Sequence, residues 1–538
     1  MKKIAFLLLI LCQLSAFSQQ EDAWVYFNAK PNSQQYLDNP LTMLTQRALD
    51  RRTTQNIPLD VNDVPIYEPY ISQVENASGI TIYAASKWLN AVHVRGGQSE
   101  IRNLTTFSFV SRIEFADKLL NTPAKNTLSK PIKKVNKTME TDVVFNYGNS
   151  ANQIQMLNGH LLHQQNYTGS GKIIAIMDGG YPGVDSASPF ARLRNNNQIL
   201  GGYDFVNRST DFYTGISHGT MVLSTMGGFQ DGQLVGTAPD ASYYLFITED
   251  GNNEGPLEES LWVEAAEEAD RLGVDIINTS LGYSVFDNPN YSHTYEDMNG
   301  TTTFISRGLN VASSRGMVCV VSAGNEGNGE WYYITAPADA TGALTVGAVN
   351  RLRNYATFSS HGPSSDGRVK PDVVAQGQAS VLSNTEGNIV TASGTSFSGP
   401  IIAGMVASFW QALPNKTNVE IMQLIRESAS IYSNPNDELG YGIPDFSEAL
   451  ASALGVTGFS DDQIKVYPNP ANGFVSVAFP SAFQNGNMTL YNALGQKVKD
   501  QKLNTQNQNV SLDQFKAGIY LYKIEANGLS QTGKIIKQ

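Results

Sequence analysis

The central part of this chain is predicted to be an α/β domain, and changes of pattern along the sequence lead to that prediction. From about residue 143 to residue 455, short apolar segments typical of buried strands alternate with amphipathic segments typical of helices. Such alternation predicts a three-layer fold, a mainly parallel sheet with helices on both faces. A smaller α+β unit precedes this part. After Leu454, short alternating segments separated by Asn, Gly and Pro predict a small β-sandwich.

The elements of the central domain follow from the periodicity of apolar residues. Residues 172–177 form a short, almost wholly apolar run, which indicates a strand buried on both faces. Residues 257–272 have the spacing of an amphipathic helix, and Gly273 leads into the next apolar run. The predicted elements are strands at 172–177, 274–278, 317–322 and 344–349, and helices at 257–272, 301–315 and 396–412.

Residues 1–18 have the layout of a secretory signal peptide. A Met-Lys-Lys start is followed by the apolar run 4–11 and by small residues around a cleavage point after Ser18. The run is well short of the ~20 residues that a membrane span needs, so an N-terminal anchor is less favoured. A lipid-anchored Cys12 is also less favoured, because the preceding Leu11 is bulky. We therefore expect an exported protein without a transmembrane helix in its mature form.

Composition argues against several functions. The chain has 37 Lys and Arg against 49 Asp and Glu, a formal net charge of −12. Since nucleic-acid binding needs clustered positive charge, no nucleic-acid partner is expected. Once Cys12 leaves with the signal peptide, Cys319 is the only cysteine, which excludes a disulfide and a cysteine metal site. Its apolar neighbours predict a buried side chain and not a nucleophile.

Two segments precede the central domain. Residues 19–117 mix extended and helical patterns, which predicts an α+β unit without a catalytic constellation. Its extended segments are at 23–29, 81–84, 91–95 and 110–115, and its helix at 40–52 ends in the pair Arg51-Arg52. Residues 118–142 contain lysines at 118, 125, 130, 133, 134 and 137 and no acidic residue as far as 137. Such a polar, like-charged stretch predicts a flexible linker that is open to proteolysis.

Four short segments place reactive side chains at the ends of strands or the starts of helices. Asp178 ends the first buried strand, where open α/β sheets bind their ligands, and two glycines follow it. His218 opens a helical stretch, Asn325 follows a strand in a Gly-Asn turn, and Ser396 begins the last helix. A helix start holds the hydroxyl and the N–H group of a serine in the positive end of the helix dipole. Taken singly, each residue has an ordinary structural alternative, such as a turn aspartate or an N-cap serine.

Taken together, these residues resemble the active site of the subtilisin family. Asp178, His218 and Ser396 occur in the order Asp, His, Ser, unlike chymotrypsin-like enzymes and α/β-hydrolases. The serine also lacks the G-x-S-x-G elbow of the hydrolases. Further segments similar to family motifs are Gly236 to Pro239, Asn278 to Gly282, Phe358 to Pro363 and Lys370-Pro371-Asp372. The chain departs from the family at Gly179, usually Ser or Thr, and at Ala375-Gln376-Gly377, usually Ala-Pro-Gly.

The resemblance implies a subtilisin-like fold and a serine endopeptidase that forms an acyl-enzyme. Ser396 would be the nucleophile, His218 its base and Asp178 the group that orients this base. Asn325 and the Ser396 backbone N–H would form the oxyanion hole. Implied substrate-binding residues are Ser280, Leu281 and Gly282 at an edge that pairs with extended substrate, and Ser322, Ala323 and Gly324 in a pocket with Thr335 near its floor.

The resemblance also bears on specificity and on metals. The aromatic run Trp331-Tyr332-Tyr333 lies close to the pocket in sequence and either shapes specificity or serves packing. An apolar or broad preference is expected. No cofactor is required. Structural calcium is common in the family, but no loop here has a recognisable ligand spacing, so no metal-binding residue is assigned.

The flanking units resemble other parts of secreted subtilases. By position, residues 19–117 are similar to the family's pro-segment, an intramolecular chaperone and inhibitor, and 118–142 then form a processing zone. Residues 456–538 resemble the C-terminal sorting domain of type IX secretion in Bacteroidetes, through segments at 466–471, 490–496 and 518–522. This implies a zymogen exported through the periplasm by the type IX machinery, then secreted or held at the outer-membrane surface. A β-module that binds carbohydrate or protein is the alternative for the tail.

Two other functions remain open for the central domain. One is a catalytically inactive, subtilisin-like surface adhesin, although all four predicted active-site residues are present. The other is an esterase or amidase that uses the same triad. Protein or peptide substrates are the expected partners of the peptidase.

Overall fold

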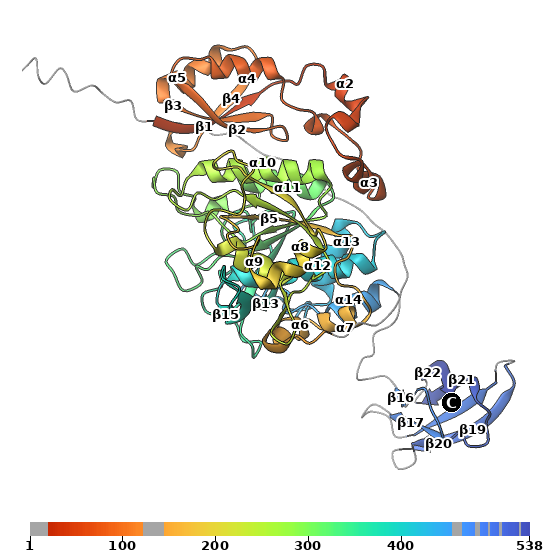
Figure 1. Cartoon of the computed structure of the whole chain (residues 1–538). Coiled ribbons are helices and arrows are strands. Elements are labelled where there is room, and N and C mark those ends of the chain that lie inside the picture. Colours follow the sequence, from red (N-terminus) through yellow and green to blue (C-terminus); the bar gives the residue numbers. More distant parts are fainter. Residues whose placement is uncertain are drawn as a thin grey trace, which may run out of the picture. The chain divides into compact units, whose positions relative to one another are not determined.

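The computed structural model describes residues 20–121, 145–454 and, in the tail, 465–538 except 468, 479–484, 493–494, 505–507 and 527–528. The predicted signal peptide and residues 122–142 of the predicted linker lie outside these residues. The chain divides into two units, 1–455 and 456–538, which are described separately (Figure 1).

The centre of the first unit is a seven-stranded sheet in which all neighbouring strands run parallel. The strand order is β13-β12-β11-β10-β5-β9-β6. The strands are β5 (Ile173–Asp178), β6 (Ile199–Asp204), β9 (Ser242–Ile247), β10 (Ile276–Thr279), β11 (Val318–Ser322), β12 (Ala343–Val349) and β13 (Val373–Gln376). The predicted α/β class is confirmed. The structure also contains three strands that the sequence analysis did not name, β6, β9 and β13.

Helices cover both faces of this sheet (Figure 1). One core contains residues of α10 (Pro256–Leu272) and α11 (Phe304–Ser314), and the other contains residues of α9 (His218–Gly227), α12 (Thr395–Ala412), α13 (Asn418–Glu427) and α14 (Phe446–Ala453). In β5, Ala175 and Met177 pack in the first core, whereas Ile174 and Ile176 pack in the second. Because side chains alternate between the faces of a strand, a strand covered on both faces must be apolar throughout.

Shorter elements complete this domain. They are α6 (Ala151–Gln155), α7 (Gly159–Gln164), α8 (Ala191–Asn195), β7 (Phe229–Gln230), β8 (Leu234–Val235), β14 (Ser380–Ser383) and β15 (Ile389–Ala392). Among the helices of the described residues, none is both long and apolar enough to cross a membrane. Cys319 is buried in β11, as its apolar neighbours predict, and burial raises the pKa of its thiol.

The N-terminal segment forms a four-stranded antiparallel sheet of order β2-β3-β1-β4. Its strands are β1 (Gln20–Phe27), β2 (Ile80–Ser86), β3 (Ala91–Gly97) and β4 (Val110–Phe115), and its helices α2 (Ser33–Leu37), α3 (Gln46–Thr54), α4 (Glu68–Glu75) and α5 (Gln98–Asn103). One face of the sheet packs with α4 and α5, and the other packs in one core with α10 and α11. The prediction of one helix over 40–52 is wrong: a short 3-10 turn at Pro40–Thr42 is followed by α3, which starts after Thr45 because this side chain accepts the Ala48 N–H.

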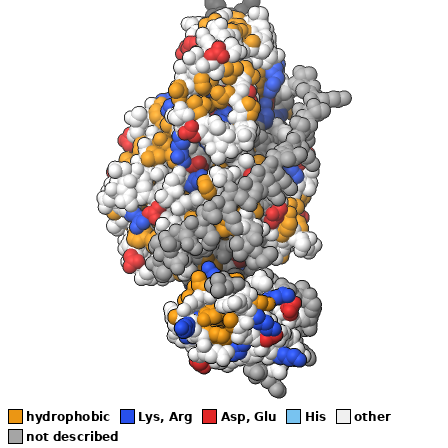
Figure 2. All heavy atoms as spheres, turned by 90° about the vertical axis from the view of Figure 1, so that its right-hand side faces the viewer, with side chains coloured by type: hydrophobic (Ala, Val, Ile, Leu, Met, Phe, Trp, Pro, Cys, Tyr) orange, Lys and Arg blue, Asp and Glu red, His pale blue; other side chains and the backbone are white. Residues whose placement is uncertain are grey.

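The C-terminal unit is a two-sheet β module. One sheet contains β16 (Lys465–Tyr467), β17 (Phe474–Ala478) and β20 (Asn509–Ser511), and the other β18 (Asn485–Tyr491), β19 (Lys497–Asn504), β21 (Gly518–Ala526) and β22 (Leu529–Lys537). A small core with Val475, Met488 and Ile524 joins them. Figure 2 shows hydrophobic side chains on the surface of this module among lysines, and Ile519, at 55% exposure, is one of its exposed apolar residues.

Candidate active site

Asp178 and His218 form a hydrogen-bonded pair at the carboxyl end of β5. His218 Nδ1 lies 2.8 Å from Asp178 Oδ1 and 3.1 Å from Oδ2. Asp178 is 1% exposed, and its Oδ1 also accepts the backbone N–H of Gly179 at 2.8 Å. With Nδ1 of the ring held by the carboxylate, Nε2 is the nitrogen available to a reacting group.

The glycines after Asp178 allow the chain before His218 to lie against this strand. Gly180 has φ 150°, and a Cβ there would be 2.4 Å from the carbonyl oxygen of Thr214. At Gly179, where the family usually has Ser or Thr, a Cβ would be 2.6 Å from the side chain of Ile216. Ile216 therefore fills the space that a side chain at position 179 would occupy.

The environment of His218 favours its protonated form. Burial by itself lowers the pKa of His218, but the charge of Asp178 and the hydrogen bond to it outweigh burial and raise the pKa above its usual value. His218 also lies beside the start of α12, because its ring centroid is 5.9 Å from that of Phe397. The imidazole thus lies beside Phe397, the residue that follows Ser396.

Ser396 is the second residue of α12, at the carboxyl end of the sheet. Its N–H has no acceptor within the helix, since the first four N–H groups of a helix are left without one. Pro400 cannot donate to the Ser396 carbonyl as a normal helical residue would, and Ser280 Oγ donates to this oxygen instead, at 3.2 Å. The Ser396 hydroxyl in turn donates to the carbonyl of Ser280, also at 3.2 Å. In this structure the serine hydroxyl therefore bonds to Ser280 and not to His218.

Asn325 is oriented by the residue that precedes the serine. Its Oδ1 accepts the backbone N–H of Thr395 at 2.8 Å and the Thr395 hydroxyl at 3.0 Å. Two donors on one oxygen fix the amide plane, so that its Nδ2 hydrogens point away from Thr395. The sequence analysis did not identify Thr395 as an orienting residue. Its only sequence signal is its position directly before Ser396.

The two segments predicted to bind substrate lie close together beside Ser396. Ser322 Oγ donates to the Thr395 carbonyl at 2.8 Å, and a Cβ on Gly399 would be 2.7 Å from that Oγ. Thr335 lies between the segments: its Oγ1 would be 2.1 Å from a Cβ on Gly282 and 3.1 Å from one on Gly324. The Thr335 hydroxyl is buried, and within the described part of the chain it has no hydrogen-bond partner. Gly282 and Gly324 therefore both pack closely against Thr335, which leaves little space for a side chain at either position.

The aromatic run just before Thr335 is a packed cluster. Tyr332 stacks on His361 with centroids 4.0 Å apart, and Tyr333 stacks on Tyr295 at the same distance. The indole N–H of Trp331 donates to the Ile334 carbonyl at 3.1 Å. These contacts give the run a packing role.

Three carboxylates near the end of β9 lie close enough to share a metal ion, and the sequence analysis did not single them out. They are Glu249, Glu254 and Glu258, with ligand atoms within 4.8 Å of one another. The hydroxyl of Tyr283, next to Gly282, donates to Glu249. Burial, followed by the charge of neighbouring glutamates, raises the pKa of Glu249 well above its usual value and that of Glu258 to about 8. Burial therefore favours the protonated form of both carboxyl groups.

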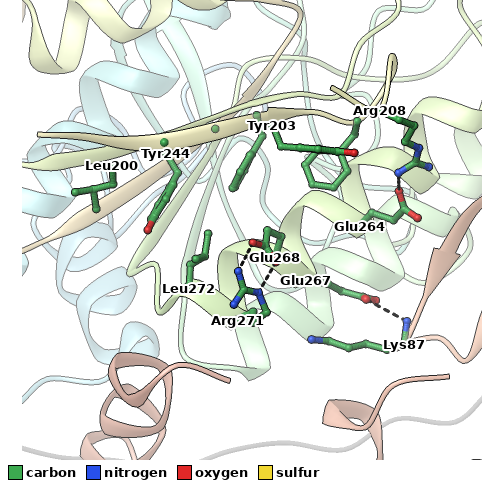
Figure 3. A pocket seen from close by; sticks show the side chains of 14 residues that line it. Lys87, Leu200, Tyr203, Arg208, Tyr244, Glu264, Glu267, Glu268, Arg271 and Leu272 are labelled. Atoms are coloured by element: carbon green, nitrogen blue, oxygen red, sulfur yellow. Dashed lines mark hydrogen bonds and ion pairs between the residues drawn. The ribbon is translucent and has the colours of Figure 1, made fainter. Parts of the chain in front are cut away.

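A pocket of about 670 Å³ lies apart from these residues, between β6, β9 and α10 (Figure 3). Tyr203 and Tyr244 line it, and four of its charged side chains form two pairs: Arg208 with Glu264, and Arg271 with Glu268. None of the predicted site residues lines it. The pocket is therefore not the predicted reaction site.

Comparisons with known proteins assign three parts of the chain. Residues 22–133 match the Peptidase S8 propeptide domain of Bacteroidota, 156–442 the Subtilase family, and 465–538 the secretion system C-terminal sorting domain. The propeptide match extends past the predicted boundary at 117 and into the predicted linker. A sorting domain indicates export, with secretion or attachment to the cell surface.

Similar proteins are subtilisins. The chain is 32% identical to subtilisin E of Bacillus subtilis (strain 168) over 285 residues, which cover 52% of this chain and 66% of that protein, slightly less than two thirds. It is 31% identical to subtilisin of Bacillus pumilus over 294 residues, covering 54% of this chain and 94% of that protein. A solved structure of MycP3 protease from the type VII (ESX-3) secretion system aligns with a TM-score of 0.46 and 19% identity, covering 59% of this chain and 92% of that chain.

The family match covers more than half of the chain and contains Asp178, His218, Asn325 and Ser396. The parallel sheet and its helices are the fold that the resemblance implied. From the fold, the motifs and this match, we conclude that the chain belongs to the subtilase family.

Proposed function

We propose that the chain is a secreted serine endopeptidase, made as a zymogen, that cleaves peptide bonds through Asp178, His218 and Ser396. The observation that carries the proposal is the bond of 2.8 Å between His218 Nδ1 and the buried carboxylate of Asp178, next to the start of α12. A neutral imidazole held in this way takes up a proton at Nε2, and the carboxylate stabilises the cation that results.

The reaction begins when the Ser396 hydroxyl turns from the Ser280 carbonyl toward His218. In enzymes without substrate, catalytic hydrogen bonds are often long or poorly aligned, and they tighten when substrate binds. Ser396 Oγ then attacks the substrate carbonyl carbon while its proton passes to His218 Nε2. The carbonyl π electrons move to the oxygen, which becomes an oxyanion in a tetrahedral intermediate.

Two donors serve the oxyanion. One is the Ser396 N–H at the start of α12, and the other is the Asn325 amide, which Thr395 orients. When the intermediate collapses, the C–N bond breaks and His218 returns the proton to the leaving amine. Water then attacks the acyl-enzyme by the same steps, and the acid product leaves. No step needs a metal or another cofactor.

Substrate binds in extended form along Ser280–Gly282, by β-augmentation. The side chain of the residue before the scissile bond lies against Ser322–Gly324, with Thr335 at the floor of its pocket. The close approach of Thr335 to Gly282 and Gly324, and its buried hydroxyl without a hydrogen-bond partner among the described residues, favour small side chains over large apolar ones. This narrows the apolar or broad preference expected from the sequence.

Labelling with a fluorophosphonate tests the catalytic part of the proposal. The secreted protein should take up one label, and Ser396→Ala should abolish it. Absence of label on the wild-type protein would support an inactive adhesin. Cleavage of a peptide library, compared with cleavage of simple esters and amides, separates a peptidase from an esterase or amidase.

Intact-mass measurements of the secreted protein test its export and processing. We propose that residues 1–18 are removed as a signal peptide, and that the pro-segment and the sorting tail are removed later. Intact masses of the secreted wild-type protein and of Ser396→Ala locate the termini and show which cuts are autocatalytic.

A further inference from the structure

Between β1 and α4 the pro-segment leaves its own sheet, and residues 45–63 of this excursion lie against the subtilase domain. We call residues 45–63 the clasp; it contains α3 and the 3-10 turn Val61–Asp63. Buried apolar residues in and beside the clasp form a hydrophobic cluster separate from the core of the pro-segment sheet. The residues of this cluster are Met43, Leu44, Ala48 and Val64. The clasp is therefore packed as a small unit of its own.

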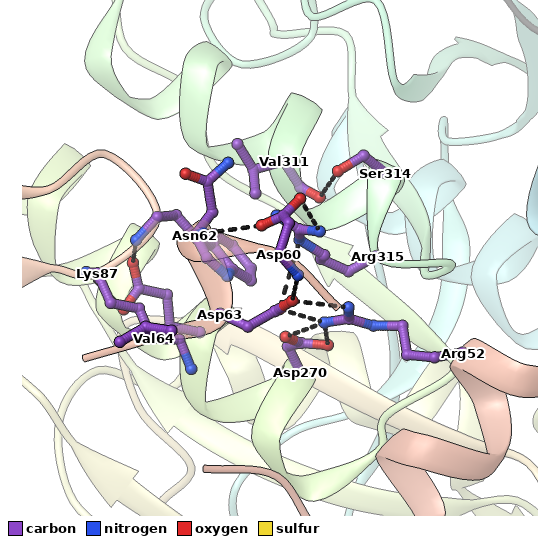
Figure 4. A network of polar contacts seen from close by, with 12 residues as sticks. Arg52, Asp60, Asn62, Asp63, Val64, Lys87, Asp270, Val311, Ser314 and Arg315 are labelled. Atoms are coloured by element: carbon purple, nitrogen blue, oxygen red, sulfur yellow. Dashed lines mark hydrogen bonds and ion pairs between the residues drawn. The ribbon is translucent and has the colours of Figure 1, made fainter. Parts of the chain in front are cut away.

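Two buried arginines of the clasp share one carboxylate of the subtilase domain. Figure 4 shows one of them, Arg52, between Asp270 and Asp63. Arg52 Nη2 lies 2.7 Å and 2.9 Å from the two oxygens of Asp270 and 2.9 Å from Asp63 Oδ1. Arg51 donates to the same Asp270. The Arg51, Arg52 and Asp270 side chains are 4%, 2% and 0% exposed. Because water is excluded from all three, loss of one partner leaves a buried charge without compensation.

In a second ion pair the charges are reversed: the arginine belongs to the subtilase domain and the carboxylate to the clasp. The guanidinium of Arg315, just after α11, binds Asp60 of the clasp through two bonds of 2.9 Å (Figure 4). Bidentate pairs of this kind are specific in geometry as well as strong. Each side of the contact therefore contributes both a cation and an anion.

Other clasp groups donate to backbone carbonyls at the points where α10 and α11 end. The last carbonyls of a helix lack helical partners and carry the negative end of its dipole, so cations and N–H donors are stabilising there. The bonds are Arg47 Nε to Gly273 O at 3.0 Å, Arg51 Nε to Arg315 O at 3.2 Å and Gln55 Nε2 to Gly316 O at 2.8 Å.

The clasp lies far from the predicted catalytic residues. Gly273 and Gly316 precede β10 and β11, so the clasp sits at the amino ends of strands whose carboxyl ends carry the site. The six residues of β5 alone separate the two edges by about 20 Å. The clasp therefore cannot block the cleft itself, and its effect must be to hold the pro-segment.

The sheet of the pro-segment makes a separate contact with α10. Glu267 accepts the backbone N–H groups of Lys87 and Trp88 at 3.1 Å and 2.9 Å, and Glu264 accepts that of Ala85 at 2.7 Å. Two attachments joined by a short chain make each other's rebinding intramolecular, which strengthens binding well beyond either alone.

We propose that the clasp is a second attachment, remote from the predicted catalytic residues, that accounts for most of the binding of the pro-segment to the subtilase domain once the linker has been cut. This rests on the proposed function only in taking the pro-segment to be the inhibitor. The partner surface is the ring of Asp270, Arg315 and the carbonyls at the ends of α10 and α11. It fits a helix that presents two adjacent arginines, as α3 does.

The test uses the full chain carrying Ser396→Ala, so that its outcome does not depend on the chain's own activity. A lysine-specific protease cuts the linker, whose lysines lie at 125, 130, 133, 134 and 137. Native size exclusion with mass analysis then measures how much pro-segment stays bound. The parent chain should retain it, and adding Arg51→Ala with Arg52→Ala should weaken retention by about 100-fold or more.

Two further variants keep the test decisive. Arg51→Lys with Arg52→Lys preserves charge and fold but not the fork geometry, and should weaken retention by about tenfold. Arg102→Ala is the matched control, since Arg102 contacts Leu120 and Phe115 of the pro-segment, and should retain the pro-segment like the parent. The proposal would be overturned if the parent and both clasp variants retained the pro-segment equally. It would also be overturned if Arg102→Ala released as much pro-segment as the clasp variants. Failure of the wild-type protein to take up fluorophosphonate would instead concern the catalytic proposal, on which this test does not depend.

Discussion

In the proposed mechanism, His218 has to be neutral to accept the serine proton, and its neighbours decide the pH at which it is neutral. Burial alone lowers the pKa of His218, but Asp178 outweighs burial and raises it. Activity is thus complete above this raised pKa and is lost as pH falls through it. A carboxylate that helps the reaction by stabilising the imidazolium also moves the acid limit of activity to higher pH.

The first prediction concerns Asp178→Asn. Turnover should fall about 10,000-fold, because the amide no longer holds the correct tautomer or stabilises the cation. The acid limb of kcat/KM should also move to lower pH, since the charge that raises the pKa of His218 is gone. Profiles of kcat/KM against pH on a chromogenic peptide test both effects. An acid limb at the same pH in both proteins would mean that another group sets it.

The second prediction concerns the amide of Asn325. Asn325→Ala should lower turnover about 100- to 1000-fold with little change in KM, since the lost bond forms only in the transition state. Thr395→Val is a matched comparison, because it removes one of the two donors to Asn325 Oδ1 and keeps the backbone donor. Its loss should stay within about tenfold. Unchanged turnover in Asn325→Ala would remove this residue from the mechanism.

At the scale of elements, the loop after β10, the end of β11 and the segment around Thr335 lie close together, and the pocket proposed for the residue before the scissile bond depends on all three. The third prediction is that Thr335→Ala enlarges this proposed pocket. It should raise kcat/KM for peptides with Phe before the scissile bond about tenfold relative to Ala peptides, as removal of side-chain atoms from a pocket does. Thr335→Ser keeps the hydroxyl and should change the ratio less. An unchanged ratio would place the pocket floor elsewhere.

The fourth prediction follows from the contact of Gly282 with Thr335. Gly282→Ala adds a Cβ that would lie 2.1 Å from Thr335 Oγ1, so one of the two segments must shift. We expect kcat/KM to drop at least about tenfold, and Thr335→Ala in the same chain to restore most of it. A double-mutant cycle in kcat/KM measures this. If the two losses add instead, the clash is not the cause.

At the scale of the whole molecule, the chain consists of two separately packed units, 1–455 and 456–538. The fifth prediction is that deletion of 456–538 leaves the Tm of the remaining unit within about 2 °C, because each unit has its own core. Export should be lost, since the sorting domain is in the deleted part. Differential scanning calorimetry and fractionation of cells and medium test the two expectations. A large drop in Tm would show that the units stabilise each other.

The sequence by itself determined the class of the central domain and the identity of its four candidate catalytic residues. Buried parallel strands are apolar throughout, so β5 and β11 could be located without a structure. Asp178, His218, Asn325 and Ser396 stand in short motifs at element ends, and their order along the chain is a property of the sequence alone.

Only the tertiary structure decided which distant groups meet. Thr395 orients Asn325, Ser280 replaces the helical donor that Pro400 lacks, and Thr335 packs against Gly282. Arg52 stood at the end of a predicted helix, and its partner Asp270 lies 218 residues later in the chain. Such pairings depend on how packed elements bring side chains together, and local sequence patterns carry no record of that packing.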